Sequence, residues 1–319
     1  MRRVCGRARG ARQHVASAVR PPDPWHAARV PPRFDASGLR DAARAVAAQA
    51  LAAGALQPIA TELATIDASG VAFQIRVVDS LRRKRVGSAT AGPRLANPFL
   101  PYEAALFVAD VPPAHVALLN KFPVIDEHLL IVTRAFVDQE APLDPADHDA
   151  AAACLHGLDG LVFYNAGAIA GASQPHRHLQ WVPALGPGAA RAPLEAAIEA
   201  ALDGDRPVQL PALPFAHAAI RLDRGTLATT DGGAHLAAQH ARLRATLGPA
   251  GASHTYNLIA TRDWLLHVPR VASGTGGVEV NALGFAGSLL VRDRDQLERA
   301  RQLGPLTILA AVAPPLTAR

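Results

Sequence analysis

The stretch NAGAIAGASQPHRHLQWVP, from Asn165 to Pro183, joins a run of small residues to an alternating pattern of polar and apolar ones. In an extended strand successive side chains point to opposite faces, so His176, His178 and Gln180 share one face. The apolar residues of HLQWV point to the other face. The stretch therefore predicts a strand that is anchored in the core on one side and presents two imidazoles and an amide on the other.

These polar groups suit chemistry on a phosphate ester. An imidazole can attack phosphorus and form a covalent intermediate, and the Gln180 amide can donate to a phosphoryl oxygen. The preceding GAIAGAS offers backbone N–H groups with little side-chain obstruction, which suits an anion-binding loop. Two other interpretations stay open at this point: histidines that only pack in the structure, and an HxH half-site for a metal ion.

Composition favours a globular, soluble protein of one large or two ordinary domains. The chain has 319 residues, 50% of them hydrophobic, which is enough for a substantial core. No uninterrupted apolar run approaches the ~18 residues that a membrane-spanning helix needs. The two cysteines, Cys5 and Cys154, are too few for a disulfide framework or a four-thiolate zinc site and favour a reducing compartment, by default the cytoplasm.

The positive charge is concentrated at the beginning of the sequence. Residues 1–35 contain eight arginines and two aspartates, a balance of +6, which leaves 36–319 at −1 out of the total of +5. We expect 1–35 to be a disordered basic extension, because it has no apolar signal core and its prolines oppose a helix. An Arg-rich transit peptide or a basic arm is the functional alternative. The nearly neutral remainder argues against an extended nucleic-acid surface.

The rest of the chain mixes helical and strand patterns. A helix is expected from Ser37, as N-cap, to Gly54 at its end, and a second has Asp144 as N-cap and Pro145 at the first helical position. VAFQIRVVD alternates as a half-buried strand does. The other expected elements are strands in AALFVAD, HVALLN, HLLIVT and LVFYN, helices in APLEAAIEAALDG and GGAHLAAQHARLRATLG, and apolar strands in YNLIATRDWLLHVPR and VEVNALGFAGSLLVR. This pattern predicts an α+β fold, and the similar layout of FPVIDEHLLIVTRAF and YNLIATRDWLLHVPR hints at two related halves.

Lysine is rare in this chain. There are 30 arginines but only two lysines, Lys84 and Lys121. A compact ammonium binds phosphate oxygens as a point charge, whereas a guanidinium is a planar fork. The two lysines are therefore candidates for phosphate contacts, with chance and a solvated basic cluster around Lys84 as the alternative.

The motif SQPHRHLQ resembles the HxHxQ signature of the nucleotidyltransferases in the histidine triad (HIT) superfamily. With the segments GALQPI, NPFLPYE, LLNKFPV, HLLIVT and FYNAG before it and YNLIATRDWLLHVPR and NALGFAGSLLV after it, it is similar to the ATP adenylyltransferase, or diadenosine tetraphosphate phosphorylase, family. The resemblance implies a HIT-like fold with a mainly antiparallel sheet and flanking helices. It also implies an N-terminal HIT-like catalytic region at 36–200 and a C-terminal ATP adenylyltransferase region at 201–319.

The activity that this resemblance implies is the reversible phosphorolysis of diadenosine tetraphosphate to ATP and ADP. His178 would attack an α-phosphorus, expel ATP and carry AMP, which inorganic phosphate would then remove as ADP. His176 would support this nucleophile, and Gln180 would hold the α-phosphoryl group. Hydrolytic HIT proteins typically carry a histidine where Gln180 stands, so Gln180 indicates transfer to phosphate.

The resemblance also implies a set of substrate-binding residues. These are Lys84, Asn120, Lys121, Asn165, Gly171, Ala172, Ser173, Gln174, Gln180, Asn281, Ala282, Leu283, Ser288 and Arg292. Ser288 and Arg292 stand where relatives commonly carry Met and Lys. A divalent cation such as Mg²⁺ is expected to bind with the nucleotide, largely through its phosphates, and no membrane or nucleic-acid partner is expected. The alternatives are a hexose-1-phosphate uridylyltransferase-like enzyme and a non-catalytic nucleotide- or RNA-binding protein.

Overall fold

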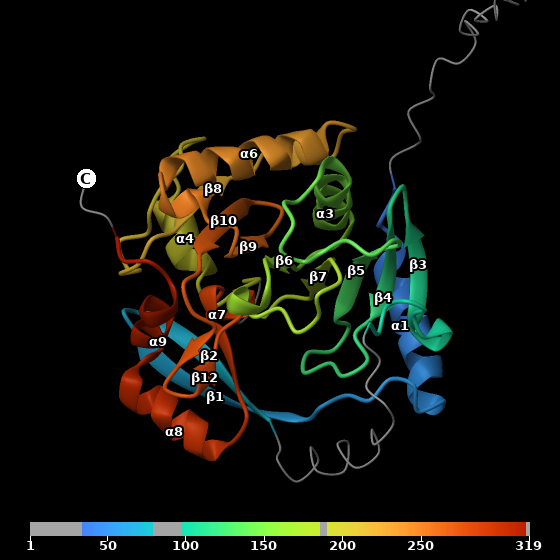
Figure 1. The fold of residues 1–319 in the computed structure, drawn as a ribbon, viewed down its shortest axis with the longest axis horizontal. Coiled ribbons are helices and arrows are strands. Elements are labelled where there is room, and N and C mark those ends of the chain that lie inside the picture. The colour runs from blue at the N-terminus through green and yellow to red at the C-terminus, as the bar shows by residue number, and fades with distance from the viewer. Residues whose placement is uncertain (1–33, 79–96, 186–189, 317–319) are drawn as a thin grey trace, which may run out of the picture. The chain divides into compact units, whose positions relative to one another are not determined.

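The computed structural model describes residues 34–78, 97–185 and 190–316, and Figure 1 shows their arrangement. Most strands belong to one eight-stranded sheet with the order β3-β4-β5-β7-β6-β9-β10-β8, in which all neighbours are antiparallel. Its strands are β3 (Phe107–Val111), β4 (His115–Leu119), β5 (Leu129–Thr133), β6 (Leu161–Asn165), β7 (His178–Val182), β8 (Ala218–Arg221), β9 (Tyr256–Ala260) and β10 (Trp264–Pro269). The expected α+β fold with a mainly antiparallel sheet is confirmed.

Two smaller sheets complete the strand structure. In the first, β2 (Val71–Val78) pairs antiparallel with β1 (Thr61–Ala68) and parallel with β13 (Ser288–Val291). The second is a hairpin of β11 (Gly274–Thr275) and β12 (Val278–Glu279). The parallel pair of β2 and β13 therefore brings residues near the start and near the end of the described chain into one sheet.

Helices cover both faces of the large sheet. They are α1 (Leu39–Ala52), α3 (Pro145–Gly157), α4 (Glu195–Ala201), α5 (Arg224–Leu227), α6 (Gly232–Thr246), α7 (Ala282–Phe285), α8 (Arg294–Leu303) and α9 (Pro305–Val312). Helices α3 and α6 pack against each other above the large sheet in Figure 1, while α8 and α9 lie beside the three-stranded sheet of β1, β2 and β13. No helix within the described ranges is long and apolar enough to cross a membrane.

The strands divide the apolar side chains between two layers, as their alternation requires. Leu179 and Trp181 of β7 belong to the core layer that α1, α3 and α6 cover. Phe163 of β6 faces the other layer, which also contains apolar side chains of the three-stranded sheet and of α4, α7, α8 and α9. The polar side chains of β7 point to this second face, so the strand separates a packed core from the candidate site.

The helix ends confirm both predictions for α3 and one of the two for α1. Asp144 caps α3 through a reciprocal capping box with Asp147, and Pro145 is the first helical residue, as expected. In contrast, Gly38 is the N-cap of α1 and no side chain caps it, so the prediction for Ser37 was wrong. Gly54 follows the end of α1 with a φ of 72°, in agreement with its expected role.

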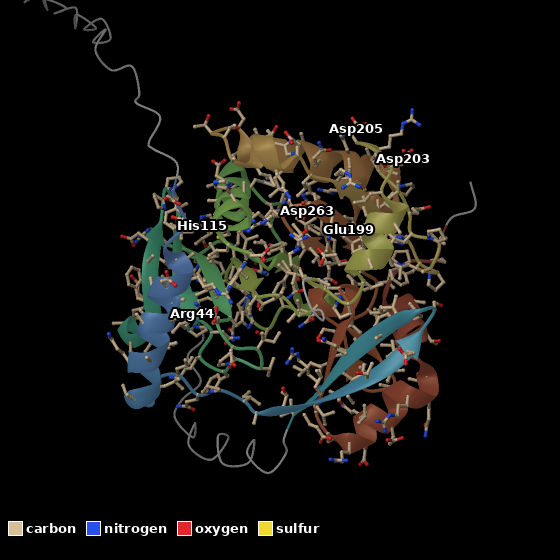
Figure 2. All side chains as sticks on the ribbon, turned by 180° about the vertical axis from the view of Figure 1, so that it is seen from behind. Arg44, His115, Glu199, Asp203, Asp205 and Asp263 are labelled. Carbon is tan, nitrogen blue, oxygen red and sulfur yellow. The ribbon has the colours of Figure 1, made fainter. Side chains whose placement is uncertain are left out.

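Charged side chains gather beside α4. Arg191 pairs there with Glu195, Glu199 and Asp263, and Figure 2 shows Glu199 and Asp263 on this side of the molecule, far from Arg44 of α1.

The boundary expected at residue 200 stays a prediction. Across it, β6 pairs directly with β9, so the two parts share one sheet. The expected extension 1–35 lies, except for its last two residues, outside the described residues.

Candidate active site

The strand β7 brings His178 and Gln180 to the site face of the sheet. His178 lies opposite Val132 of β5, and Gln180 lies opposite Leu130 of β5 and Phe163 of β6. Paired residues on adjacent strands share a face, so this register places both polar groups on the face predicted from the sequence. Gln139 fixes the strand locally, because its Oε1 accepts a hydrogen bond from the His178 backbone N–H at 2.8 Å.

His178 is held as a neutral imidazole with one nitrogen available for attack. Its Nδ1 lies 2.8 Å from the backbone carbonyl oxygen of His176. Because a carbonyl only accepts, Nδ1 carries the proton and Nε2 keeps its lone pair. Burial lowers the pKa of His178 to about 4. The ring is therefore neutral near pH 7, which is the form a nucleophile requires.

His176 supports this arrangement through its backbone and is itself fixed on both ring nitrogens. Its Nε2 donates to the carbonyl oxygen of Thr133 at 2.9 Å, and its Nδ1 accepts from the Asn97 amide at 3.1 Å. Both His176 and His178 rings lie against Phe99, with centroids 5.6 and 5.5 Å apart from it. Since both nitrogens of His176 are used within the protein, the pair is not arranged as a metal half-site.

A relay of hydrogen bonds fixes the amide of Gln180. The Asn120 side-chain oxygen accepts from the Phe122 backbone N–H, which turns its amide nitrogen toward Nδ1 of His128 at 3.1 Å. His128 must then carry its proton on Nε2, which donates to Oε1 of Gln180 at 2.9 Å. The Gln180 amide nitrogen remains as a donor. Burial lowers the pKa of His128 to about 4, so this neutral tautomer persists at neutral pH.

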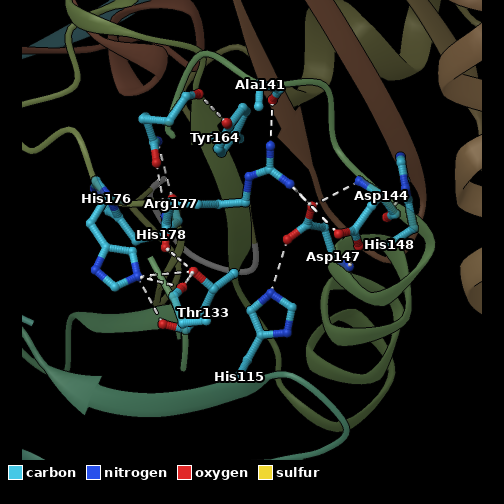
Figure 3. A network of polar contacts seen from close by, with 12 residues as sticks. His115, Thr133, Ala141, Asp144, Asp147, His148, Tyr164, His176, Arg177 and His178 are labelled. Atoms are coloured by element: carbon cyan, nitrogen blue, oxygen red, sulfur yellow. Dashed lines mark hydrogen bonds and ion pairs between the residues drawn. The ribbon is translucent and has the colours of Figure 1, made fainter. Parts of the chain in front are cut away.

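Behind the strand, Arg177 points away from the two histidines into a buried ion-pair network (Figure 3). Its guanidinium donates to Asp147 at 2.7 Å and to the carbonyl oxygens of Ala141 and Pro142. His115 contacts the other oxygen of Asp147 at 2.9 Å. Because Asp147 also belongs to the capping box of α3, this network ties the strand between His176 and His178 to the start of a helix.

The glycine-rich loop forms one wall of a cavity of about 390 Å³. The lining includes five of the expected binding residues, namely Gly171, Ala172, Ser173, Asn281 and Arg292. Gly171 has a φ of 94°, and a Cβ there would lie 2.8 Å from both the Asn281 Cβ and the Val280 carbonyl oxygen. Only glycine permits this close approach. The loop then leads directly into β7, so the cavity wall and His178 belong to one continuous segment.

The loop's backbone amides are less free than the sequence suggested. The N–H groups of Gly171 and Ala172 donate to the carbonyl oxygens of Ala168 and Gly167 within the loop. No described residue accepts a hydrogen bond from the N–H groups of Ser173 or Gln174. An anion would therefore meet the end of the loop rather than its middle. Gln174 is half-buried and is not part of the cavity lining.

Asn165 joins the loop to the C-terminal part of the chain. Its Oδ1 accepts from the Asn257 amide at 2.8 Å and from the Ala282 backbone N–H at 2.9 Å. Asn281 caps α7, with its side chain accepting from the Leu283 N–H. Asn165, Ala282 and Leu283 are buried, so their closest contacts in the structure are with the protein itself.

The expected cationic residues are paired with carboxylates. Lys121 donates to Glu103 at 2.6 Å, and Arg292 donates to Glu279, which also lines the cavity. Ser288 is buried within β13 and does not line the cavity. Lys84 lies outside the described residues. The described part of the chain contains no group of three or more His, Cys, Asp or Glu side chains that could hold a metal ion.

The structure adds residues that sequence reasoning missed. His128 shares its face of the sheet with Leu130, which lies opposite Gln180, so the strand period and the register together could have identified it. Arg177 shares the parity of Leu179, so the same alternation could have placed it on the buried face. Its partner Asp147 could not have been chosen, because the sequence does not state how α3 packs on β7.

A neutral imidazole with an unprotonated Nε2, an oriented amide donor on the same strand and a glycine-lined cavity formed by the preceding loop are typical of one class of protein, the histidine-dependent nucleotidyltransferases. Residues 31–200 match the family model described as Ap4A phosphorylase N-terminal domain, and residues 211–315 match ATP adenylyltransferase C-terminal domain, where Ap4A denotes diadenosine tetraphosphate. The chain belongs to the Ap4A phosphorylase family.

Individual relatives agree with this assignment. Diadenosine 5',5'''-P1,P4-tetraphosphate phosphorylase 2 of Saccharomyces cerevisiae is 30% identical over 208 residues, which cover 57% of this chain and 63% of that protein, less than two thirds of its length. The crystal structure of yeast Ap4A phosphorylase Apa2 matches with a TM-score of 0.74 and 26% identity, covering 89% of this chain and 97% of that one. The structure of Apa2 in complex with Ap4A matches with a TM-score of 0.74 and 25% identity, covering 89% and 100%.

Proposed function

We propose that this chain catalyses the reversible phosphorolysis of diadenosine tetraphosphate to ATP and ADP, with His178 as the nucleophile. The observation that carries the proposal is the state of His178, whose Nδ1 proton is held by a backbone carbonyl while Nε2 remains unprotonated. The family membership and the relative crystallised with Ap4A supply the substrate.

The reaction proceeds in two substitutions at one phosphorus atom. In the first, Nε2 of His178 attacks the α-phosphorus of one adenosine, and the bond from that phosphorus to the bridging oxygen breaks, which releases ATP. Nδ1 keeps its proton throughout, because the carbonyl of His176 stabilises the positive charge that develops on the ring. In the second, an oxygen of inorganic phosphate attacks the same phosphorus, the N–P bond breaks, and ADP leaves with His178 restored.

Gln180 serves this reaction as a fixed hydrogen-bond donor. Its amide nitrogen donates to a non-bridging oxygen of the α-phosphoryl group while His128 holds its Oε1. A donor that is already oriented stabilises charge in the transition state without reorganisation. His176 acts through its carbonyl on the tautomer of His178.

The cavity beside the loop takes the rest of the substrate in this proposal. Ser173 and Asn281 line this cavity and contact the polyphosphate, with Gln174 beside them in the chain. Arg292 binds phosphate once it leaves its ion pair with Glu279. Asn165 holds the loop and α7 in position from behind. Asn120, Lys121 and Lys84 contribute from the first part of the chain, with Lys121 exchanging Glu103 for a phosphate oxygen.

Mg²⁺ arrives with the nucleotide in this proposal, and the described residues include no group of three or more His, Cys, Asp or Glu side chains that could hold it. It would screen the charge of the polyphosphate, with most of its ligands from phosphate and water. The expected partners are diadenosine tetraphosphate, ATP, ADP and inorganic phosphate. We also propose a cytoplasmic setting, in keeping with a free, buried Cys154.

The test is a phosphate-dependence assay on the purified full chain. Incubation with diadenosine tetraphosphate and inorganic phosphate should give ATP and ADP in equal amounts, with no turnover when phosphate is omitted. Activity on uridine diphosphate sugars instead would transfer the chain to the uridylyltransferase-like alternative.

A labelling experiment tests the nucleophile separately. An α-labelled nucleotide should leave label on the wild-type protein and none on His178→Ala, because the acceptor nitrogen is gone. Label that persists on His178→Ala would remove His178 from this role. Nucleotide or RNA binding without turnover, lost on deletion of residues 1–35, would instead support a binding protein.

A further inference from the structure

Arg270 is a buried cation without a carboxylate partner among the described residues. Its side chain is 2% exposed, and its guanidinium donates to the side-chain oxygen of Asn257 and to backbone carbonyl oxygens. The carbonyl partners are those of Ala170, Ala272, Ser273, Val280 and Val312. Burial lowers the pKa of Arg270 to about 10. Arg177 is buried to a similar extent but has Asp147 as its counter-ion.

Burying a charge without a counter-ion costs free energy. An anion that binds close to Arg270 would offset this cost, so the surroundings of Arg270 matter. Of its six partners, Ser273 and Val280 line the cavity, and Ala170 lies within the loop that lines it. Ala170 lies between Ala168 and Gly171, which line one wall, while Ser273 and Val280 line the other. Arg270 therefore sits directly behind the cavity and bonds to both sides of it.

These hydrogen bonds also orient the backbone of the walls. The carbonyl oxygens of Ala170 and Val280 point to Arg270, at 3.1 and 3.0 Å. The negative ends of these peptide groups are thus turned toward the guanidinium and away from the cavity. Inside the lining, the described charged groups are Glu279 and Arg292, which pair with each other. Arg270 adds a further positive charge on the protein side of these walls.

We propose that Arg270 is a positioning residue that makes the cavity selective for polyphosphates. The positive charge of Arg270 is not neutralised by a carboxylate of the described residues, so it attracts the anion. Its hydrogen bonds hold the two walls together and keep the carbonyl oxygens of Ala170 and Val280 turned away from the cavity. The inference rests on the proposed function for the identity of the ligand as a polyphosphate. It is independent of the bond-making step at His178.

The test measures binding of inorganic tripolyphosphate to the full chain by isothermal titration calorimetry. Arg270→Gln, which retains some hydrogen bonds but no charge, should weaken binding about tenfold or more, whereas Arg270→Lys should stay within about threefold of wild type. Arg191→Gln is the matched control, because Arg191 is a largely buried arginine with carboxylate partners beside α4. It should lower stability without changing the dissociation constant.

A second pair of variants keeps Arg270 in place. Asn257→Asp places a carboxylate against the guanidinium, and Asn257→Ser changes the same contacts without adding charge. Asn257→Asp should bind tripolyphosphate about tenfold more weakly than Asn257→Ser. This pair decides the question if neither Arg270 variant folds.

Three results would overturn the proposal. They are the absence of tripolyphosphate binding in the wild type, an equal loss of affinity in Arg270→Gln and Arg270→Lys, and equal affinities in Asn257→Asp and Asn257→Ser. Turnover of diadenosine tetraphosphate is assayed in parallel on the wild type. Binding that depends on Arg270 without any turnover would contradict the proposed function alone, and turnover without that dependence would contradict only the role of Arg270.

Discussion

Replacing His128 tests how the site prepares Gln180. His128→Leu removes the Nε2–H that holds Oε1 of Gln180 at 2.9 Å. The Gln180 amide can then rotate, so that its Oε1 faces the phosphoryl group in place of the Nε2 that should donate to it. A net hydrogen bond contributes about 1 kcal/mol, and loss of a donor to a transition-state oxygen costs roughly 3 kcal/mol. Because ~1.4 kcal/mol corresponds to a factor of ten, kcat should fall about 10- to 100-fold.

The assay is steady-state phosphorolysis of diadenosine tetraphosphate, with KM and kcat measured separately. His128 does not contact the substrate in this mechanism, so KM should change by less than about threefold while kcat carries the loss. His128→Gln is the matched variant, because a second amide can accept from Asn120 and donate to Gln180. It should recover a substantial part of kcat.

The pH profile separates positioning from damage to the nucleophile. Burial lowers the pKa of His178 to about 4, and in the proposed reaction only its neutral form attacks. In the wild type kcat/KM should therefore stay level near neutrality and fall as the pH drops through about 4. His128→Leu should keep this acid limb while its plateau is lower. The reasoning would be refuted by a kcat within about twofold of wild type, or by equal losses in His128→Leu and His128→Gln.

Three further variants test the scaffold of the site. Gly171→Ala should raise KM and lower the free energy of unfolding by about 1–3 kcal/mol in urea titrations, because its Cβ would lie 2.8 Å from Asn281 and Val280. Gly248 has a φ of 54° and open space around it. Gly248→Ala should therefore lower the free energy of unfolding less and leave KM unchanged. Burial lowers the pKa of His240 to about 3, so the unfolded chain binds an extra proton as the pH falls below about 6.5. Between pH 6 and 4 the free energy of unfolding of His240→Gln should therefore decline less steeply than that of the wild type, by up to ~1.4 kcal/mol per pH unit, whereas His254→Gln at an exposed position should match the wild type. Asp147→Asn should destabilise the fold by about 3–5 kcal/mol in urea titrations, because it leaves the buried Arg177 guanidinium with the exposed Asp144 carboxylate at 3.8 Å in place of its buried counter-ion at 2.7 Å. An unchanged unfolding midpoint would show that this network carries no stability.

The elements with a clear period were predictable from the sequence. The alternation predicted that His178 and Gln180 share a face, as they do in the register of β7. The capping residues of α3 were predicted correctly because they act within one turn. The strand β1 was not expected, since TELATIDA has only a weak alternation and gains its partner from β2. The cap of α1 was wrong because Ser37 lies one residue before the actual N-cap.

The contacts that prepare the site depend on packing between distant segments. His128 reaches Gln180 across 52 residues of sequence, and Arg270 reaches Ala170 across 100. Neither contact leaves a local pattern, because each residue obeys the period of its own strand or loop. The candidate residues on one strand were therefore predictable, whereas the residues that orient them required the sheet order.

The relay also explains why glutamine at position 180 suits a phosphate acceptor. A histidine there could take a proton from water and so produce a nucleophile, whereas an amide has no such capacity at neutral pH. His128 fixes Gln180 further as a donor, with its oxygen already occupied. In the proposed reaction the acceptor must therefore bring its own nucleophilic oxygen, as inorganic phosphate does. By this argument the side chain at 180 disfavours water as acceptor, while His178 performs the same attack in either case.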